Sequence, residues 1–331
     1  MAGDRLTLVT GGAGFIGSHL VERLVRRGDR VVAIDNLSTG RRSNLNGVDP
    51  SRLTFIEGTV SEVVQSVDPS GVDGIYHLAA AVGVRLVIKK PIGTIETNVG
   101  ETSAALEFAA AGRTPILIAS TSEVYGKSER IPFAEYDDVV YGPPSQPRWA
   151  YACSKAIDEF LALAHHRENG VPVVVARFFN IVGPRQVGEY GMVLPRFVAS
   201  ALAGDPIEVY GDGAQTRCFC DVRDVVDLLP RLLDDPRCAG GIFNVGRDEL
   251  IEIGELARLV KDTLGSRSPI VRVPYDQAFG PGFDDLMHRQ PDLTRLRAAV
   301  GFAPKFSLVQ TIRDLAAASG ESVQRSVEST I

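Results

Sequence analysis

The chain has 331 residues, of which 44% are hydrophobic and 23% are charged, and its 35 basic and 41 acidic side chains give a formal net charge of −6. This composition is typical of a soluble globular protein, and the acidic balance argues against nucleic acid or an anionic membrane as the main partner. No apolar run approaches the roughly 18 residues that a membrane-spanning helix needs, and no signal peptide is visible.

The sequence contains four cysteines: Cys153, Cys218, Cys220 and Cys238. They are too few for a disulfide framework in a chain of this length. Cys218 and Cys220 lack a second pair of ligands, so no metal site is predicted. We therefore expect a reducing, cytoplasmic location.

Apolar runs rich in β-branched residues alternate with helical stretches as far as about Phe179. Strands are predicted at Leu6–Thr10, Arg30–Ile34, Leu53–Glu57, Gly74–Leu78, Pro115–Ser120 and Val173–Phe178. Helices are predicted at Gly17–Arg27, Thr94–Ala111, Ala150–Asn169, Met192–Ala203, Val222–Leu233 and Ile253–Leu264. Continuous apolar strands separated by helices indicate an α/β fold, in which helices cover both faces of a parallel sheet.

The alternation loosens after Phe179, where short strands are predicted at Ile207–Val209, Ile242–Val245 and Ile270–Val273. We interpret this part as a smaller C-terminal α/β lobe that covers the sheet and binds substrate. The predicted domains are a nucleotide-binding domain at 1–179 and a substrate lobe mainly at 184–320, with returns to the first domain near 180–183 and 221–246. The polar tail at 321–331 is expected to be frayed.

A glycine-rich turn follows the first predicted strand and opens the first helix: Gly11-Gly12-Ala13-Gly14-Phe15-Ile16-Gly17. In this context Gly11 permits a tight turn, Gly14 lets a pyrophosphate approach the backbone, and Gly17 lets the helix pack closely. The helix N-terminus favours phosphate. Asp35 ends the second strand, ~20 residues further on, where a carboxylate binds a ribose 2′-hydroxyl. This Rossmann-type pattern favours NAD, although the nearby Arg41 and Arg42 leave NADP open.

Tyr151 and Lys155 lie at positions i and i+4 of a predicted helix, on one helical face. A nearby ammonium favours the phenolate, so Lys155 is expected to lower the pKa of Tyr151 toward neutrality. A tyrosine of that pKa removes a proton from an alcohol while a hydride leaves to a nicotinamide. A solvated helix face is the alternative, and the dinucleotide turn favours catalysis.

Thr121, Ser122 and Glu123 follow the fifth predicted strand, at the carboxyl edge of the sheet. Ligands bind at this edge in open α/β sheets, so the three side chains are candidate catalytic residues. The alternatives are capping of the next turn by the two hydroxyls and a solvated loop position for Glu123.

Together these residues resemble the extended short-chain dehydrogenase/reductase family, the nucleotide-sugar epimerases, dehydratases and decarboxylases. Further matching motifs are His77-Leu78-Ala79-Ala80, Asn98, Arg177-Phe178-Phe179-Asn180, Tyr210-Gly211-Asp212-Gly213 with Arg217, and Phe243-Asn244-Val245-Gly246. The resemblance implies a bound NAD that is reduced transiently, with Tyr151 as the base and Lys155 on the nicotinamide ribose. Thr121 or Ser122 would join Tyr151 at the sugar 4-hydroxyl.

The resemblance also implies two sets of binding residues. The NAD set is Gly11, Gly14, Phe15, Ile16, Gly17, Asp35, Asn36, Leu78, Ala79, Ala80, Asn98, Tyr151 and Lys155. The set for a nucleotide-sugar substrate, with UDP favoured, is Arg85, Asn180, Arg196, Tyr210, Arg217 and Arg289. One departure is Gly58-Thr59, because the family usually has Gly-Asp there, with the Asp near adenine; a backbone N–H is a possible substitute.

Only a few positions distinguish between the reactions that members of this family catalyse. Thr121-Ser122-Glu123 and the segment from Phe279 to Pro291, which contains Arg289, resemble UDP-glucuronate decarboxylases. In those enzymes the residues matching Glu123 and Arg289 act at the sugar carboxylate. Decarboxylation to a UDP-pentose or a UDP-4-keto-pentose is favoured over 4-epimerisation of UDP-glucuronate or UDP-glucose.

Two further alternatives are a 4,6-dehydratase, which usually carries Asp-Glu where this chain has Ser122-Glu123, and a non-catalytic dinucleotide-binding protein. The presence of both Tyr151 and Lys155 argues against the second. Family members often pair through two helices, so the resemblance implies a homodimer through Thr94–Ala111 and Ala150–Asn169.

Overall fold

The computed structural model describes residues 4–81, 91–188, 192–279 and 286–328. Within these residues the largest sheet has seven strands, in the order β11-β6-β5-β4-β1-β2-β3. All of its neighbouring strands are parallel. The strands are β1 (Leu6–Thr10), β2 (Arg30–Asp35), β3 (Leu53–Glu57), β4 (Gly74–His77), β5 (Ile116–Thr121), β6 (Val173–Phe178) and β11 (Gly241–Val245).

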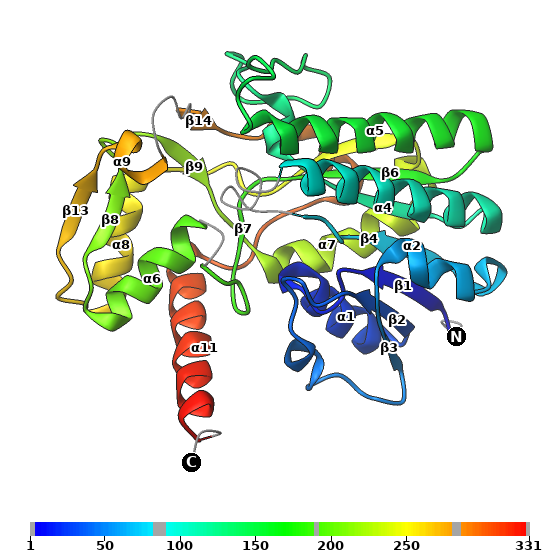
Figure 1. The fold of residues 1–331 in the computed structure, drawn as a ribbon, viewed down its shortest axis with the longest axis horizontal. Coiled ribbons are helices and arrows are strands. Elements are labelled where there is room, and N and C mark those ends of the chain that lie inside the picture. The colour runs from blue at the N-terminus through cyan, green and yellow to red at the C-terminus, as the bar shows by residue number, and fades with distance from the viewer. Residues whose placement is uncertain (1–3, 82–90, 189–191, 280–285, 329–331) are drawn as a thin grey trace.

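Helices cover both faces of this sheet (Figure 1). Alternate strand residues point to opposite faces, so Val174 joins one hydrophobic core while Val173 and Val175 join the other. The first core includes α1 (Phe15–Arg27) and α7 (Val222–Asp234); the second includes α2 (Val60–Val63), α4 (Pro91–Gly112) and α5 (Trp149–Asn169). This arrangement confirms the predicted α/β, doubly wound parallel sheet.

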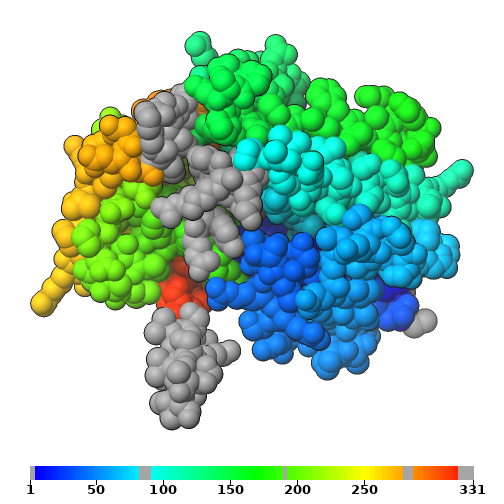
Figure 2. Space-filling view, in the orientation of Figure 1, coloured from blue at the N-terminus to red at the C-terminus, as the bar shows by residue number. Residues whose placement is uncertain are grey.

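The second lobe lies beside the first, at the left of Figure 1 and Figure 2. Strands β8 (Ile207–Tyr210) and β13 (Ile270–Val273) pair in parallel. They share a core with α6 (Val193–Ala203), α8 (Ile253–Leu264) and α11 (Leu308–Glu328), and α9 (Tyr275–Phe279) follows β13. A three-stranded sheet joins β12 (Leu250–Glu252), β9 (Thr216–Cys218) and β14 (His288–Arg289) in that order.

The chain returns to the first lobe more than once. Strand β7 (Ile181–Val182) pairs with β10 (Cys220–Asp221), and β11 completes the large sheet beside β6. A third return was not predicted: α10 (Thr294–Val300) packs on the first lobe, with Leu296 and Val300 in its core. The domain boundaries drawn from the sequence therefore remain approximate in this region.

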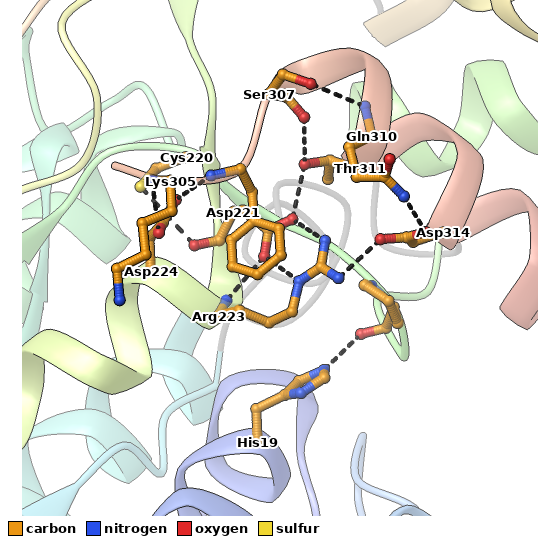
Figure 3. A network of polar contacts seen from close by, with 12 residues as sticks. His19, Cys220, Asp221, Arg223, Asp224, Lys305, Ser307, Gln310, Thr311 and Asp314 are labelled. Atoms are coloured by element: carbon orange, nitrogen blue, oxygen red, sulfur yellow. Dashed lines mark hydrogen bonds and ion pairs between the residues drawn. The ribbon is translucent and has the colours of Figure 1, made fainter. Parts of the chain in front are cut away.

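A buried carboxylate joins the C-terminal helix to the first lobe (Figure 3). Asp221 accepts hydrogen bonds from the backbone N and the guanidinium of Arg223, at 2.7–2.8 Å, and from Thr311 Oγ1 of α11 at 2.7 Å. Arg223 also pairs with Asp314 of α11 at 2.7 Å. Helix α11 runs past Gly320 as far as Glu328, and the expected fraying of the tail stays a prediction.

Most predicted elements agree with the structure to within a few residues. Helix α4 begins at Pro91, three residues before the predicted start, because proline is well suited to a first helical turn. Strand β4 ends at His77 rather than Leu78, and the N–H groups of Leu78 and Ala79 both lie 3.2 Å from the Thr10 hydroxyl. Among the described residues, no helix is both long and apolar enough to cross a membrane.

Candidate active site

The glycine-rich turn joins β1 to α1 and presents the helix N-terminus at the carboxyl edge of the sheet. Gly11 has a φ of +67°, and a Cβ on it would lie 2.9 Å from the Ala79 nitrogen. A Cβ on Gly17 would lie 2.0 Å from the Gly11 carbonyl oxygen. Positions 11 and 17 therefore require glycine. The backbone N–H groups of the turn suit a dinucleotide diphosphate.

Asp35 lies next to this turn at the end of β2. Its carboxylate accepts hydrogen bonds from the backbone N of Ala13 at 3.0 Å and of Leu37 at 2.8 Å, which fix it beside the glycines. Phe15 and Ile16 pack against the first core, and the exposed Asn36 accepts from the Ser38 nitrogen at 3.1 Å. The residues present therefore fit a dinucleotide.

Thr59 has a different role from the one considered for it. Its side chain and backbone N–H form a capping box with Glu62 at the start of α2, and Glu101 binds the next two backbone N–H groups. The Thr59 N–H is thus already bonded within the protein, so it is poorly suited to replace the missing Asp at adenine.

Asn98, a predicted NAD contact, is bonded to the protein. It is buried on α4, where its Oδ1 accepts from the Ala81 nitrogen at 2.8 Å and its Nδ2 donates to Ser154 Oγ at 3.1 Å. These bonds tie the loop that contains Leu78, Ala79 and Ala80 to helix α5. Contact of Asn98 with NAD remains a prediction.

The candidate catalytic groups come from four separate elements. Tyr151 is buried in the first turn of α5, and the Thr121 hydroxyl at the end of β5 hydrogen-bonds to it. Thr121 Oγ1 also caps the short 3-10 helix that holds the buried Ser122 and Glu123. Arg289, on β14, has its Nη1 3.9 Å from Glu123 Oε1. The structure thus brings Thr121, Tyr151, Glu123 and Arg289 to one edge of the sheet.

The predicted substrate-binding residues lie on several elements. Arg289 and Arg217 are register partners on β14 and β9, and both are buried. The Arg196 guanidinium carbon lies 4.0 Å from the centre of the Tyr210 ring. Asn180 donates from Nδ2 to the Cys218 carbonyl at 3.0 Å. Arg85 lies outside the described residues.

Known proteins resemble this chain in sequence and in fold. The model of the NAD dependent epimerase/dehydratase family matches residues 7–246. The chain belongs to this family. Its glycine turn, its Tyr151–Lys155 helix and, apart from Leu6, its seven-stranded sheet lie within the matched residues.

Relatives within the family include named decarboxylases. UDP-N-acetyl-alpha-D-glucosaminuronate decarboxylase of Bacillus cytotoxicus is 41% identical over 313 residues, 93% of this chain and 95% of that protein. UDP-glucuronic acid decarboxylase 2 of Arabidopsis thaliana is 38% identical over 308 residues. The match spans 92% of this chain and 65% of the plant protein, slightly less than two thirds of its length.

Solved structures share the fold over nearly the whole chain. The epimerase Mth375 of Methanothermobacter thermautotrophicus has a TM-score of 0.88 at 26% identity and covers 97% of this chain and 93% of its own. The dTDP-glucose 4,6-dehydratase DesIV of Streptomyces venezuelae, solved with NAD bound, has a TM-score of 0.83 at 30% identity, covering 96% and 97%.

The structure does not show the expected lowering of the Tyr151 pKa by Lys155. Burial raises the pKa of Tyr151, and the negative charges of Glu123 and Asp158 raise it further, while the Thr121 hydrogen bond lowers it. The Lys155 ammonium donates to Asp158 Oδ2 at 2.6 Å, so its positive charge is balanced within α5. The helical spacing of Tyr151 and Lys155 is as predicted, but the electrostatic consequence is wrong here.

No role was predicted for four buried polar residues on or beside α5. These are Thr10, His77, Thr102 and Asp158, which lie on β1, β4, α4 and α5. The available signal was the i, i+3 spacing of Lys155 and Asp158, which places opposite charges on one helical face.

Proposed function

We propose that the protein binds NAD and decarboxylates UDP-glucuronate through a 4-keto intermediate. The observation that carries this proposal is the pairing of Arg289 with Glu123 beside Thr121 and Tyr151, at the carboxyl edge where open α/β sheets bind their ligands. A guanidinium binds a carboxylate through two parallel hydrogen bonds, so Arg289 suits the sugar carboxylate. The decarboxylase names of relatives at 38–41% identity support the same reaction.

NAD would be held by the glycine turn at its diphosphate and by Asp35 at its adenosine ribose. Lys155 would hold the nicotinamide ribose, and the loop from Leu78 to Ala80 would line the cofactor. When bound, NAD supplies a hydride acceptor for C4 of the sugar. The fit rests on the glycines at positions 11 and 17 and on the fixed position of the Asp35 carboxylate.

At C4, Tyr151 would accept the proton of the 4-hydroxyl as the hydride leaves, a step that requires the phenolate, so the charges of bound NAD⁺ and Lys155 would have to offset the effect of burial on the pKa of Tyr151. The Thr121 and Ser122 hydroxyls would orient that oxygen, and the hydrogen bond from Thr121 to Tyr151 supports their common target. The resulting ketone lies β to the sugar carboxylate. A β-keto acid loses carbon dioxide readily, because the electrons of the broken C5–C6 bond move to the ketone oxygen as an enolate.

The enolate would be stabilised by the hydroxyl groups that surround the C4 oxygen. Arg289 would hold the departing carboxylate in place, and Glu123 would fix the guanidinium from its other side. A proton then adds to C5 and gives a UDP-4-keto-pentose, or a UDP-pentose once hydride returns to C4. The UDP diphosphate would lie against Arg217, Arg196, Tyr210 and Asn180, with Arg217 as a bidentate partner.

The second candidate is 4-epimerisation, favoured by the structural likeness to the epimerase Mth375 at a TM-score of 0.88. In that reaction the ketone would turn over and be reduced on its opposite side, and the carboxylate would have no role. The pairing of the buried Arg289 with the half-buried Glu123 favours decarboxylation.

We also propose a homodimer formed through α4 and α5. These helices lie against each other and face outward in Figure 1 and Figure 2. Four large apolar side chains are exposed on them: Ile92, Ile95, Ile157 and Phe160. Exposed apolar patches of this kind mark association surfaces.

The four cysteines are free thiols, which is consistent with the predicted cytoplasmic location.

The experiment is to incubate the protein and NAD⁺ with UDP-glucuronate and to identify the product by mass and NMR. Loss of carbon dioxide with formation of a UDP-pentose or UDP-4-keto-pentose is expected. UDP-N-acetylglucosaminuronate, suggested by the name of the Bacillus cytotoxicus relative, is the competing substrate. UDP-galacturonate as the product would establish epimerisation instead.

A further inference from the structure

Asn244 lies near the carboxyl end of β11, is fully buried, and has no part in the reaction proposed above. Its Nδ2 donates to the carbonyl oxygens of Phe133 at 2.9 Å and of Asp292 at 3.2 Å. A carbonyl oxygen only accepts hydrogen bonds, so these two contacts fix the amide with its NH₂ group toward them. The amide oxygen Oδ1 then faces Tyr125, whose hydroxyl donates to it at 2.6 Å.

The Tyr125 contact reaches the segment that holds Glu123. Tyr125 is the last residue of the 3-10 helix Ser122–Tyr125, two residues after Glu123. The Gly126 nitrogen donates to the Glu123 carbonyl at 3.0 Å and closes this turn. The buried Tyr125 ring stacks on Phe133, with the ring centres 4.7 Å apart. The bond from Tyr125 to the amide therefore fixes one end of the turn that presents Glu123.

The two carbonyl contacts reach the segment that follows Arg289. Arg289 lies on β14, which pairs with β9. Immediately after β14, the Phe133 nitrogen donates to the Gln290 carbonyl and the Phe133 carbonyl accepts from the Asp292 nitrogen, both at 2.8 Å. Asn244 binds the carbonyls of Phe133 and Asp292 at the same place. The backbone after Arg289 is thus held against the first lobe by this amide.

One amide therefore joins the two segments that carry Glu123 and Arg289. The two charged groups do not fix their own separation, because Arg289 Nη1 lies 3.9 Å from Glu123 Oε1, beyond hydrogen-bond distance. Their backbones set it instead. A small approach would let the guanidinium close on Glu123, and the present spacing leaves its donors able to bind a second carboxylate, which needs well-aligned N–H groups.

We propose that Asn244 is a positioning residue for recognition of the sugar carboxylate: it holds the Glu123 turn and the Arg289 segment at the separation that keeps the Arg289 donors available. This inference rests on the proposed function for the identity of the carboxylate ligand. An alanine at this position would leave the Tyr125 hydroxyl and the Asp292 carbonyl without this buried partner. The two segments would then no longer be joined through one group.

The test is calorimetric binding of UDP-glucuronate and of UDP-glucose to the full-length protein saturated with NADH. The reduced cofactor accepts no hydride, so neither sugar is oxidised during the measurement. In Asn244→Ala we expect UDP-glucuronate to bind about tenfold more weakly, the lower end of what a hydrogen bond to a charged group contributes, and UDP-glucose to change less than about twofold. Tyr125→Phe keeps the stacked ring and loses one bond, so a smaller loss, again selective for UDP-glucuronate, is expected.

A double variant shows whether Asn244 acts through Arg289. In the Arg289→Gln background, Asn244→Ala is expected to cause no further loss of UDP-glucuronate affinity, because the group that it positions is already gone. Thr114→Val is the matched control. It removes a buried hydroxyl that donates to the Val72 carbonyl at 3.2 Å, just before β5 and at the opposite end of that strand from the site. It should lower stability and leave both affinities unchanged.

Equal weakening of the two ligands by Asn244→Ala, no weakening of either, or additive losses in the double variant would overturn the proposal. If Asn244→Ala does not fold, Tyr125→Phe is carried through the same comparison and the same double variant, and the same results decide. Failure of the proposed function has a different signature, because Arg289→Gln itself would then not distinguish UDP-glucuronate from UDP-glucose. If Arg289→Gln distinguishes them and Asn244→Ala does not, only the role of Asn244 is wrong.

Discussion

Replacement of Arg289 by Gln tests which group recognises the sugar carboxylate. The Arg289 side chain is 10% exposed, and its Nη1 lies 3.9 Å from Glu123 Oε1, beyond ordinary hydrogen-bond distance. Its Nε has no hydrogen-bond partner among the described residues. The guanidinium is therefore desolvated but not fully committed to Glu123, which leaves donors for a substrate carboxylate.

The expected magnitude follows from these contacts. A hydrogen bond to a charged group contributes about 1.5–3 kcal/mol, and more where the groups are desolvated. Loss of a paired interaction, partly offset by relief of the competing Glu123 contact, should cost about 3 kcal/mol. This corresponds to a fall of roughly 100-fold in kcat/KM for carbon dioxide release from UDP-glucuronate. Arg289→Lys keeps the charge but loses the fork, so an intermediate loss is expected.

The assay compares two ligands and two arginines. UDP-glucose lacks the carboxylate, so its binding to Arg289→Gln should be nearly unchanged. Arg297→Gln is the control, since Arg297 is 48% exposed and pairs with Asp248 at 2.9 Å, where a surface ion pair contributes only about 0–1 kcal/mol. Equal losses for UDP-glucuronate and UDP-glucose, or unchanged activity with UDP-glucuronate, would refute the role given to Arg289.

Three further predictions concern the cofactor, the assembly and pH. Gly17→Ala places a Cβ 2.0 Å from the Gly11 carbonyl oxygen, so it should weaken NAD⁺ binding at a cost of about 1–3 kcal/mol. Calorimetry measures this loss. Gly71→Ala is the control, because a Cβ there meets open space, and it should leave NAD⁺ binding unchanged. Phe160→Asp, at a side chain 68% exposed, should convert a dimer to a monomer in analytical ultracentrifugation, while Leu202→Asp on α6 should leave the mass unchanged. His77 has its pKa lowered by burial to about 3, so only the unfolded chain binds its proton as pH falls below 6.5. Stability should therefore fall by about 1.4 kcal/mol per pH unit from this residue below 6.5, and urea unfolding of His77→Asn should lack that slope; equal slopes would contradict it.

Much of the fold follows from local pattern, because strands buried on both faces are continuous apolar runs. Strands β1, β3 and β6 and helix α8 have the predicted bounds. Helix α10 could not be assigned to the first lobe, since its short apolar pattern does not indicate which core it joins. The partner of an apolar face is decided by the path of the chain, which a local pattern does not contain.

The roles of the site residues stay predictions, but the places of several follow from local pattern. The glycines and Thr121 follow the ends of parallel strands β1 and β5, whereas Arg289 reaches Glu123 from β14 of a separate sheet. The pKa of Tyr151 depends instead on burial and on Asp158, which recruits the Lys155 charge. Helical spacing gave the neighbours of Tyr151 on one face, but it did not tell which neighbour the ammonium would bind.

The central claim is that carbon 6 of the sugar leaves as carbon dioxide after oxidation at carbon 4. The direct measurement is turnover of UDP-glucuronate carrying ¹³C at C6, with and without deuterium at C4, followed by NMR and gas analysis. Oxidation at C4 followed by decarboxylation predicts that ¹³C-labelled carbon dioxide is released. The release should be slower from the substrate deuterated at C4, and Tyr151→Phe should release none. A UDP-hexuronate product that retains the ¹³C carboxylate would contradict it.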